Sequence, residues 1–249
     1  MVVKRQPKRL GEYAYQEIKE LILKNKLVPG QNLSIGYLAE TLNLSQTPIR
    51  EALGRLNAEG LIVHTAHKKI RVSEITDEDL LQTYQARKLL EPQLVEILTQ
   101  SLSKGSTFLR AAQKLHKNIN KVLESDMSEV NIDLYLQIDK QLNDLIMLPV
   151  RGTLTGDLQL TINERSLRFR NYAETFATED TQKENMIRVI SREHLNIVQA
   201  IIAQDSNMAK AYTLIHLENS KQRTFASLKH ANNFPLESGA THKVAGIGS

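Results

Sequence analysis

Residues 42–62, LNLSQTPIREALGRLNAEGLI, place a proline inside a segment whose apolar residues otherwise recur at helical spacing. Proline removes a backbone donor and clashes one turn back, so a helix tolerates it only in the first turn. Pro48 therefore fixes where this helix starts. The predicted first residue is Ser45, Gln46 or Thr47.

A second short helix is predicted directly before this one, over 35–43, because Asn43 can adopt the left-handed conformation that ends a helix. Ser45 and Thr47 are both suitable N-caps for the helix that follows. Two short helices thus meet at a tight turn. The second begins with Ser, Gln, Thr and Arg side chains, which suit phosphates and base edges better than a core.

The flanking segments complete a small domain. A first helix, EYAYQEIKELILKNKL, precedes the predicted loop VPGQNLS, and Gly60 ends the helix over 45–59. Two β-rich runs, 61–63 and 70–72, are separated by a polar, basic tip and indicate a hairpin. Three helices and a basic hairpin predict a winged helix-turn-helix.

Positive charge is concentrated in this first third. Residues 1–76 hold 12 Lys and Arg against 7 Asp and Glu, a net +5, whereas residues 77–249 hold 20 against 21. Basic charge gathered in one small domain is typical of a nucleic-acid binder, although solvated lysines give the same count in many proteins.

Composition excludes several classes of protein. The chain has no cysteine, which excludes disulfides, thiolate zinc sites and a cysteine nucleophile and fits a reducing compartment. No segment has the length of a membrane span, and residues 1–10 lack the apolar stretch of a signal peptide. We expect a cytoplasmic protein without a membrane partner.

After residue 76 the pattern is helical throughout. A capping signal at 76–79 begins a helix that runs to about Gln100, and five further helical segments follow. The predicted fold is mainly α, a winged helix-turn-helix followed by an all-α antiparallel bundle of about six helices. The predicted domains are 1–76 and 77–230, with a flexible tail over 231–249.

With these elements in order, the sequence resembles the GntR family of bacterial transcription regulators, in the FadR subfamily with an all-helical FCD-type effector domain. The matching stretches are LVPGQNL, LAETLNLSQTPIREALGRLNAEGLI, IRV, ARKLLEP and REHLNIVQAIIAQDSNMAKAYTLIH, within residues 10–220. The resemblance implies a ligand-responsive repressor. It would read a pseudo-palindromic DNA operator as a homodimer, and its helical domain would dimerise and bind the effector.

Arg50 is the first candidate for base recognition, because it lies one turn into the helix that would enter a major groove. A guanidinium there can donate two bonds to guanine, worth about 1–3 kcal/mol of discrimination. The alternative is a surface arginine paired with Glu51 or Glu59. Gln46 stands where the family often has arginine, and its amide suits adenine or a phosphate. Further phosphate candidates are Ser45, Thr47 and Arg55.

The hairpin tip is cationic and can enter a minor groove or contact the DNA backbone. Its candidate residues are His64, His67, Lys68, Lys69 and Arg71. The two histidines have a metal-like spacing, but a hairpin tip offers them no third ligand. The family usually has glycine where Lys69 stands.

Polar groups also lie on helix faces that are otherwise apolar. Buried ionisable groups are costly unless they are paired, hydrogen-bonded or coordinated, and convergence on one cavity would explain all of them. The groups concerned are Arg87, Glu91, Asp139, His194 and His216. The alternative is an i,i+4 ion pair between Arg87 and Glu91, with each histidine a hydrogen-bonded core residue.

The resemblance implies a divalent metal, Zn, Ni or Mn, held by Asp139, His194 and His216. The fourth position is Asn143 instead of histidine, and its carbonyl oxygen is a weaker ligand than imidazole. The implied effector is a small carboxylate bound by Arg87, with a fatty acyl-CoA thioester as the alternative. The remaining effector candidates are Tyr84, Glu91, Arg165 and Tyr172.

Two other functions can be compared with the sequence. An enzyme would use the same metal to activate water, but the sequence has no phosphate-binding Gly-rich loop, nucleophile elbow or facing carboxylate pair. We therefore predict that the chain is not an enzyme. An effector-blind DNA binder, whose helical domain only dimerises, stays open.

Overall fold

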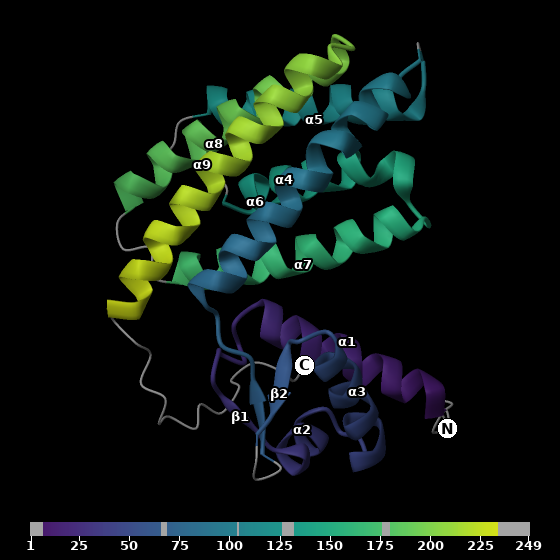
Figure 1. The fold of residues 1–249 in the computed structure, drawn as a ribbon, viewed down its shortest axis with the longest axis vertical. Coiled ribbons are helices and arrows are strands. Elements are labelled where there is room, and N and C mark those ends of the chain that lie inside the picture. The colour runs from purple at the N-terminus through teal and green to yellow at the C-terminus, as the bar shows by residue number, and fades with distance from the viewer. Residues whose placement is uncertain (1–6, 66–68, 104, 126–131, 176–179, 234–249) are drawn as a thin grey trace. The chain divides into compact units, whose positions relative to one another are not determined.

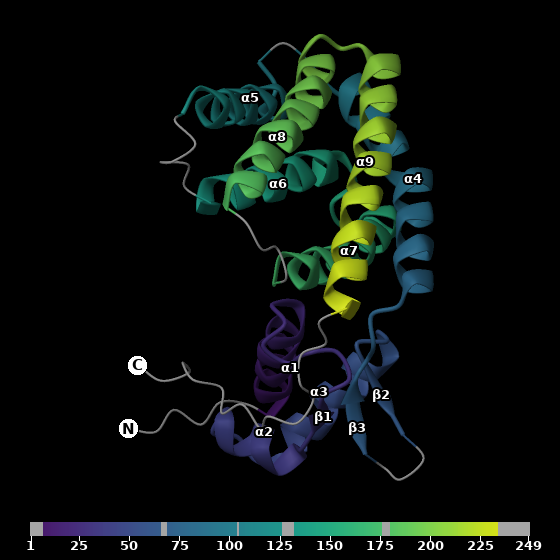
Figure 2. The same ribbon diagram turned by 90° about the vertical axis from the view of Figure 1, so that its left-hand side faces the viewer.

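The computed structural model of the chain describes residues 7–65, 69–103, 105–125, 132–175 and 180–233. Its chain divides into two compact units, shown in two views in Figures 1 and 2. The N-terminal unit falls within Met1–Thr76, Leu167–Thr175 and Leu228–Ser249. The helical unit falls within Asp77–Ser166 and Phe176–Ser227.

The N-terminal unit contains a three-stranded antiparallel sheet in the order β1-β3-β2, with Asn32 and Val63 flanking Arg71 of the central strand. α1 packs against α3, and apolar side chains of both, such as Ile18 and Ile49, are fully buried. This is the predicted winged helix-turn-helix. Its elements are α1 (Pro7–Leu23), β1 (Asn32–Leu33), α2 (Ile35–Thr41), α3 (Gln46–Ala58), β2 (Ile62–His64) and β3 (Ile70–Val72).

The turn between α2 and α3 follows from three residues. α3 begins at Gln46, so Pro48 occupies its first turn and is buried there. Asn43 has a φ of 53° and Gly60 a φ of 73°, the left-handed conformation that lets the chain leave each helix. These local predictions are confirmed.

Two local predictions for this unit are wrong, and a third is confirmed only in part. The segment predicted as a loop, VPGQNLS, contains β1, because a two-residue strand is too short to show periodicity. α1 ends at Leu23, and Asn25 with a φ of 53° turns the chain out of the helix before KNKL is complete. Ser45 is the N-cap residue of α3, as predicted, but its side chain makes no capping hydrogen bond.

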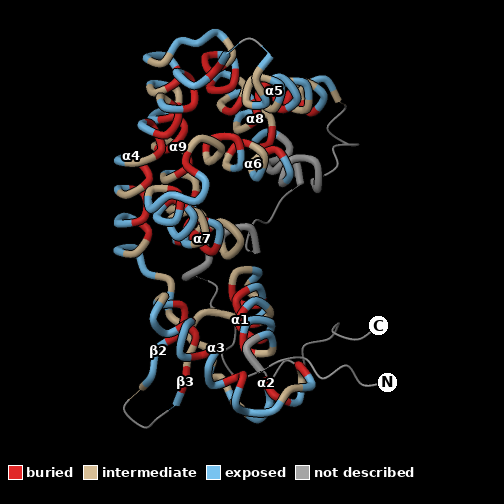
Figure 3. Tube along the Cα trace, turned by 90° about the vertical axis from the view of Figure 1, so that its right-hand side faces the viewer, coloured by how far each residue is buried: buried red, intermediate tan, exposed pale blue. Residues whose placement is uncertain are grey.

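In the described part of the chain after Thr76, six helices and one 3-10 turn form the predicted bundle (Figure 1). Buried residues line the inner faces of the helices, and exposed ones line the outer faces (Figure 3). The mainly helical fold is confirmed, although η2 was not predicted. The elements are α4 (Asp77–Gln100), α5 (Thr107–Glu124), α6 (Ile132–Met147), η2 (Leu148–Val150), α7 (Leu154–Thr175), α8 (Asp180–Ile202) and α9 (Ser206–Asn233).

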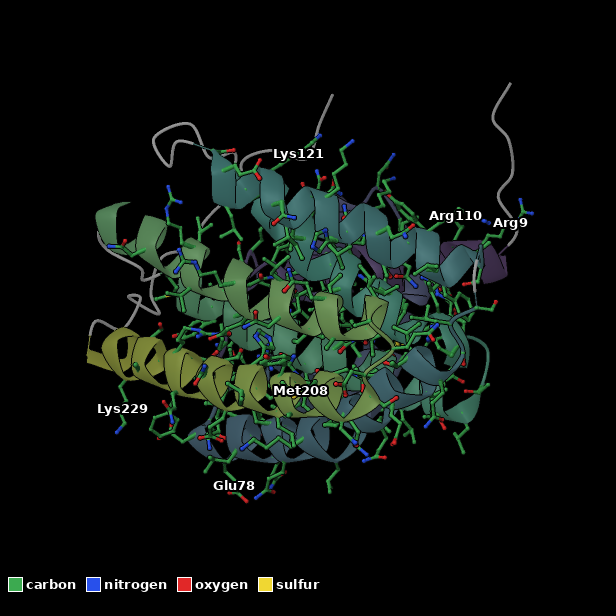
Figure 4. The ribbon with its side chains drawn as sticks, turned by 90° about the horizontal axis from the view of Figure 1, so that it is seen from above. Arg9, Glu78, Arg110, Lys121, Met208 and Lys229 are labelled. Atoms are coloured by element: carbon green, nitrogen blue, oxygen red, sulfur yellow. The ribbon has the colours of Figure 1, made fainter. Side chains whose placement is uncertain are left out.

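The core of the helical unit lies where α4, α5, α6 and α8 meet, around side chains such as Leu94, Ile119, Ile138 and Val198. α9 runs alongside α4 (Figures 2 and 4). Ion pairs join these two helices, with Lys210 2.7 Å from Glu96 and Lys88 bonded to Glu218. None of the described helices combines the length and apolarity that crossing a bilayer requires. Of the predicted tail, residues 231–233 belong to α9, and residues 234–249 lie outside the described part.

Candidate nucleic-acid interface and buried polar clusters

The N-terminal turn of α3 presents a polar edge. Ser45, Gln46, Thr47 and Arg50 are exposed, whereas Pro48 faces the core. Their exposure follows from helix geometry, because the apolar residues that hold α3 on the domain occupy the opposite face. These four candidates for DNA binding therefore share one accessible surface, which we call the α3 edge.

Arg50 has a neighbour on this edge. Its Nη2 donates a hydrogen bond of 3.4 Å to Oε1 of Gln46, one turn earlier. The alternative pairing with Glu51 or Glu59 is not found among these described residues, and Glu59 instead accepts a hydrogen bond from Tyr15 and is ion-paired with Lys19. An exposed bond of this length is weak, so both side chains can exchange it for contacts with base edges.

Arg55 differs from the other candidates on α3. Its Nη1 lies 2.6 Å from Oε2 of Glu12, and its guanidinium carbon lies 3.6 Å from the centre of the Tyr15 ring. The Arg55 guanidinium, which is predicted to contact phosphate, is thus already bound to side chains of α1.

The wing is the hairpin formed by β2 and β3. At its tip the backbone N–H of Thr65 donates a hydrogen bond of 2.9 Å to the carbonyl of Lys69. His64 and Lys69 are exposed, and Arg71 is half-buried in the central strand. The other two predicted wing contacts, His67 and Lys68, lie outside the described residues.

In the helical unit, the first polar cluster joins α4 to α7. Arg87 donates from Nε and Nη2 to the two oxygens of Glu91, at 2.6 and 3.3 Å, and from Nη1 to Ser166, at 3.0 Å. Gln159 donates to Glu91 at 3.2 Å. All four side chains are buried. The alternative i,i+4 ion pair is therefore correct, and Glu91 occupies the guanidinium edge predicted for an effector carboxylate.

Tyr84 stands beside this cluster, with its ring 5.1 Å from the Arg87 guanidinium carbon. Its buried hydroxyl is hydrogen-bonded to Ser220 at 2.8 Å and to Thr224 at 3.1 Å. The structure thus brings together three of the five effector candidates. Of the other two, Arg165 is exposed on α7, and Tyr172 lies in Leu167–Thr175, which belongs to the N-terminal unit.

A second polar cluster joins α6, α8 and α9. Nε2 of His194 lies 3.9 Å from Oδ1 of Asp139, and the rings of His194 and His216 are 4.7 Å apart. Nδ1 of His216 is hydrogen-bonded to Glu193 at 2.8 Å. Three of the four predicted metal ligands are therefore neighbours, but the polar groups form two clusters instead of converging on one cavity.

Glu193 is the member of this cluster that the sequence reasoning missed. Arg223 donates to both of its oxygens at 2.8 Å, and Asn219 donates to one at 2.9 Å. Burial raises the pKa of Glu193, but these bonds and the one to His216 outweigh it and lower the pKa to about 2. The signal for this group is the spacing of His216, Asn219 and Arg223, which places all three on one face of α9.

Asn143 decides whether the implied metal fits. Its Nδ2 donates to the backbone carbonyl of Asp139 at 3.0 Å and to Oδ2 of the same residue at 3.2 Å. Turning the amide over would place its oxygen against two acceptors, so the nitrogen faces Asp139. Within the described residues, no three His, Asp or Glu side chains are placed to hold a metal ion. The four-ligand centre that the resemblance implies does not fit.

A hollow of about 220 Å³ lies elsewhere, between α5, α6 and η2. It is lined by alanine and leucine residues and by four polar ones, Lys114, Gln141, Asp144 and Arg151. None of the predicted effector or metal residues lines it.

Comparison with known proteins identifies both parts of the chain. Residues 10–72 match the model of the bacterial regulatory proteins of the gntR family, and residues 82–219 match the FCD domain model. The uncharacterized HTH-type transcriptional regulator YdhC of Bacillus subtilis (strain 168) is 22% identical over 218 residues, which cover 87% of this chain and 89% of that protein.

Two further comparisons agree. The HTH-type transcriptional repressor GlaR of Escherichia coli (strain K12) is 28% identical over 120 residues, 48% of this chain and 53% of that protein. The structure of E. coli McbR/YncC has the same fold, with a TM-score of 0.68 at 17% identity over 88% of this chain and 98% of that one. The chain therefore belongs to the GntR family of bacterial regulatory proteins, as a DNA-binding transcription regulator with an FCD domain after its winged helix-turn-helix.

Proposed function

We propose that the protein is a repressor of the FadR subfamily that reads a pseudo-palindromic operator as a homodimer and responds to a small carboxylate. The observation that carries the DNA-reading part is the α3 edge, where Gln46 and Arg50 are exposed side by side. Repression is proposed because the relative GlaR is named a transcriptional repressor. The fold and its relatives favour regulation over catalysis.

The α3 edge suits a major groove. Arg50 would donate two parallel bonds to O6 and N7 of a guanine, and Gln46 would contact a neighbouring base or phosphate. The hydroxyls of Ser45 and Thr47 lie at the positive end of the α3 dipole, where a phosphate is stabilised. Lys69 and His64 of the wing would contact backbone beside the groove, together with the predicted contacts His67 and Lys68.

A homodimer would present two such edges related by a two-fold axis. Their spacing on DNA would then be one helical turn or a multiple of it, about 10 base pairs from centre to centre. An effector that changes this spacing would weaken operator binding. A coupling free energy of about 1–3 kcal/mol, which is ordinary for allosteric proteins, lowers the operator affinity about 5- to 150-fold.

The effector would bind inside the helical unit. Two buried acceptors there, Oε1 of Gln159 and Oγ of Ser191, make no hydrogen bond within the described part of the chain. Such groups are costly unless a ligand or water satisfies them. A carboxylate that reaches Arg87 would have to replace Glu91 on its guanidinium, which gives the site two states. The carboxylate class itself rests on the family resemblance.

DNA reading is tested with Arg50→Ala. After selection of the operator from a random duplex library, we expect the variant to lose about 5- to 150-fold in operator affinity, the value of one bidentate base contact. Its affinity for a shuffled duplex should stay close to that of the wild type. Arg110→Ala, which removes an exposed arginine from α5, is the matched control. Equal operator binding by Arg50→Ala and wild type contradicts the proposed readout.

Effector binding is tested by thermal shift, because a molecule that binds only the native state raises its stability. We expect at least one short organic or sugar acid to raise the Tm and to weaken operator binding. A Tm that responds to acyl-CoA thioesters and not to carboxylates favours the alternative effector. A Tm that responds to neither class favours the effector-blind alternative.

A further inference from the structure

Five side chains form a continuous network between α1 and α3. Tyr15 donates from its hydroxyl to Oε1 of Glu59 at 2.6 Å and accepts from Lys19 at 2.7 Å. Lys19 also lies 3.0 Å from Oε2 of Glu59. Arg55 covers the Tyr15 ring and pairs with Glu12. We call this network the α1–α3 clamp; its members are Glu12, Tyr15, Lys19, Arg55 and Glu59.

The clamp lies away from the base-reading edge of α3. In a helix each residue turns by about 100°, so Arg50 is displaced by only about 40° from Gln46, whereas Arg55 is displaced by about 140° from Arg50. Arg55 therefore points to another side of α3, where α1 packs.

The charges of the clamp are balanced within the domain. Two cations, Lys19 and Arg55, meet two carboxylates, Glu12 and Glu59. A phosphate that bound Arg55 would have to displace Glu12, and the Tyr15 ring holds the guanidinium by a cation–π contact in addition. A balanced, stacked arginine is poorly placed to gain from an added anion.

We propose that Arg55 is a positioning residue for operator recognition, which fixes the orientation of α3 through the clamp, and that it does not contact DNA phosphate. The proposal rests on the proposed function, because it assumes that α3 reads bases. The clamp grips the C-terminal half of α3, while the α3 edge lies at the other end. A small rotation about the clamp therefore displaces Gln46 and Arg50 from the bases.

The two roles of Arg55 predict opposite results for Glu12→Gln. If Arg55 contacts phosphate, removing the Glu12 charge releases it and strengthens DNA binding. If Arg55 positions α3, the same change loosens the clamp and weakens binding to the operator. Both Glu12 and Arg55 are about half exposed, so neither variant places a charge in the core and both are expected to fold.

The experiment measures binding of the selected operator and of a shuffled duplex by fluorescence anisotropy at several salt concentrations. The variants are Glu12→Gln and Arg55→Met, the latter keeping an apolar chain on Tyr15. Lys69→Met, at the exposed wing, is the matched control for a lost phosphate contact. Each phosphate contact contributes about 0.9 to the slope of log K against log salt on B-DNA.

We expect both clamp variants to lower the ratio of operator to shuffled affinity by about fivefold or more, within the range of one base contact. Their salt slopes should equal that of the wild type, whereas the slope of Lys69→Met falls by about 0.9. The positioning role is overturned if Glu12→Gln binds the operator more tightly than wild type does. It is also overturned if the slope of log K against log salt is reduced by about 0.9 in Arg55→Met. If the wild type binds the operator no more tightly than the shuffled duplex, the proposed function itself is wrong. Neither of the two outcomes above gives that result.

Discussion

Arg223 on α9 and Glu193 on α8 form a bidentate ion pair, with both N–O distances at 2.8 Å. The pair is largely withdrawn from water, since the side chains are 21% and 12% exposed. Removing Arg223 leaves the Glu193 carboxylate poorly solvated, with only the bonds to His216 and Asn219 to stabilise it. We therefore expect this pair to stabilise the contact between α8 and α9 more than the surface ion pairs of the same unit stabilise theirs.

We expect Arg223→Met to lower the free energy of unfolding by about 3 kcal/mol, the lower end of the range for breaking a buried pair. Chemical denaturation of the two proteins measures the difference. Arg151→Met is the control, because its pair with Asp144 is more than half exposed on both sides and should cost less than about 1 kcal/mol. A similar loss of unfolding free energy in the two variants would show that burial does not set the strength of these ion pairs.

The clamp gives an acid-dependent prediction. Hydrogen bonds from Gln16 and Arg55 lower the pKa of Glu12 below 4.5 in the folded chain. A carboxylate with a lowered folded pKa stabilises the protein above its unfolded pKa, and this contribution is lost as the pH falls through the folded value. The Tm of wild type should exceed that of Glu12→Gln at pH 7, and the difference should shrink as the pH falls below 4.5 towards the lowered folded pKa.

This prediction is checked by thermal melts of both proteins across that range. Repeating them with Arg55→Met as the background removes one of the two hydrogen bonds, so the Glu12→Gln difference in Tm should be smaller there at pH 7. A difference that stays constant from pH 7 to pH 3 would contradict the assigned cause.

Gly54 offers a stabilising substitution. It lies exposed inside α3, and an added Cβ would meet no described atom within 4 Å. Glycine inside a helix costs about 0.5–1 kcal/mol relative to alanine, so Gly54→Ala should raise the free energy of unfolding by that amount. Gly156→Ala is the contrasting control, because its Cβ would lie 2.3 Å from the carbonyl oxygen of Val150. We expect that variant to be destabilised, and denaturation of both without DNA decides the signs.

The predictable part of the fold depended on residues that restrict the backbone. Pro48 and Asn43 locate the turn between α2 and α3 whatever surrounds them, and long apolar periodicity locates the bundle helices. β1 has two residues and exists because β3 pairs with it, so no local pattern reveals it. Contacts between helices were equally hidden, as the pairing of Glu193 with Arg223 shows.

The candidate sites divide in the same way. The α3 edge is a local property of one helix start, and the structure presents its residues together as expected from their spacing. The role of Arg87 depends on which group pairs with its guanidinium, and the packed structure shows that this group is Glu91. Periodicity places a polar group on a buried face, but it cannot say what satisfies the group there.

Asn143 provides the sharpest test of the second polar cluster, because a single substitution supplies the histidine that this position lacks. A histidine one turn after Asp139 lies on the same helix face, beside His194 and His216. We expect Asn143→His to bind Zn²⁺ or Ni²⁺ about tenfold or more tightly than wild type, since imidazole is the better ligand for these ions. Calorimetric titration with each metal alone measures both affinities. Asn118→His, which adds a histidine on α5, controls for adventitious binding. Equal affinity in wild type and Asn143→His would mean that the Asn143 amide turns to offer its oxygen, contrary to the hydrogen bonds that it donates to Asp139.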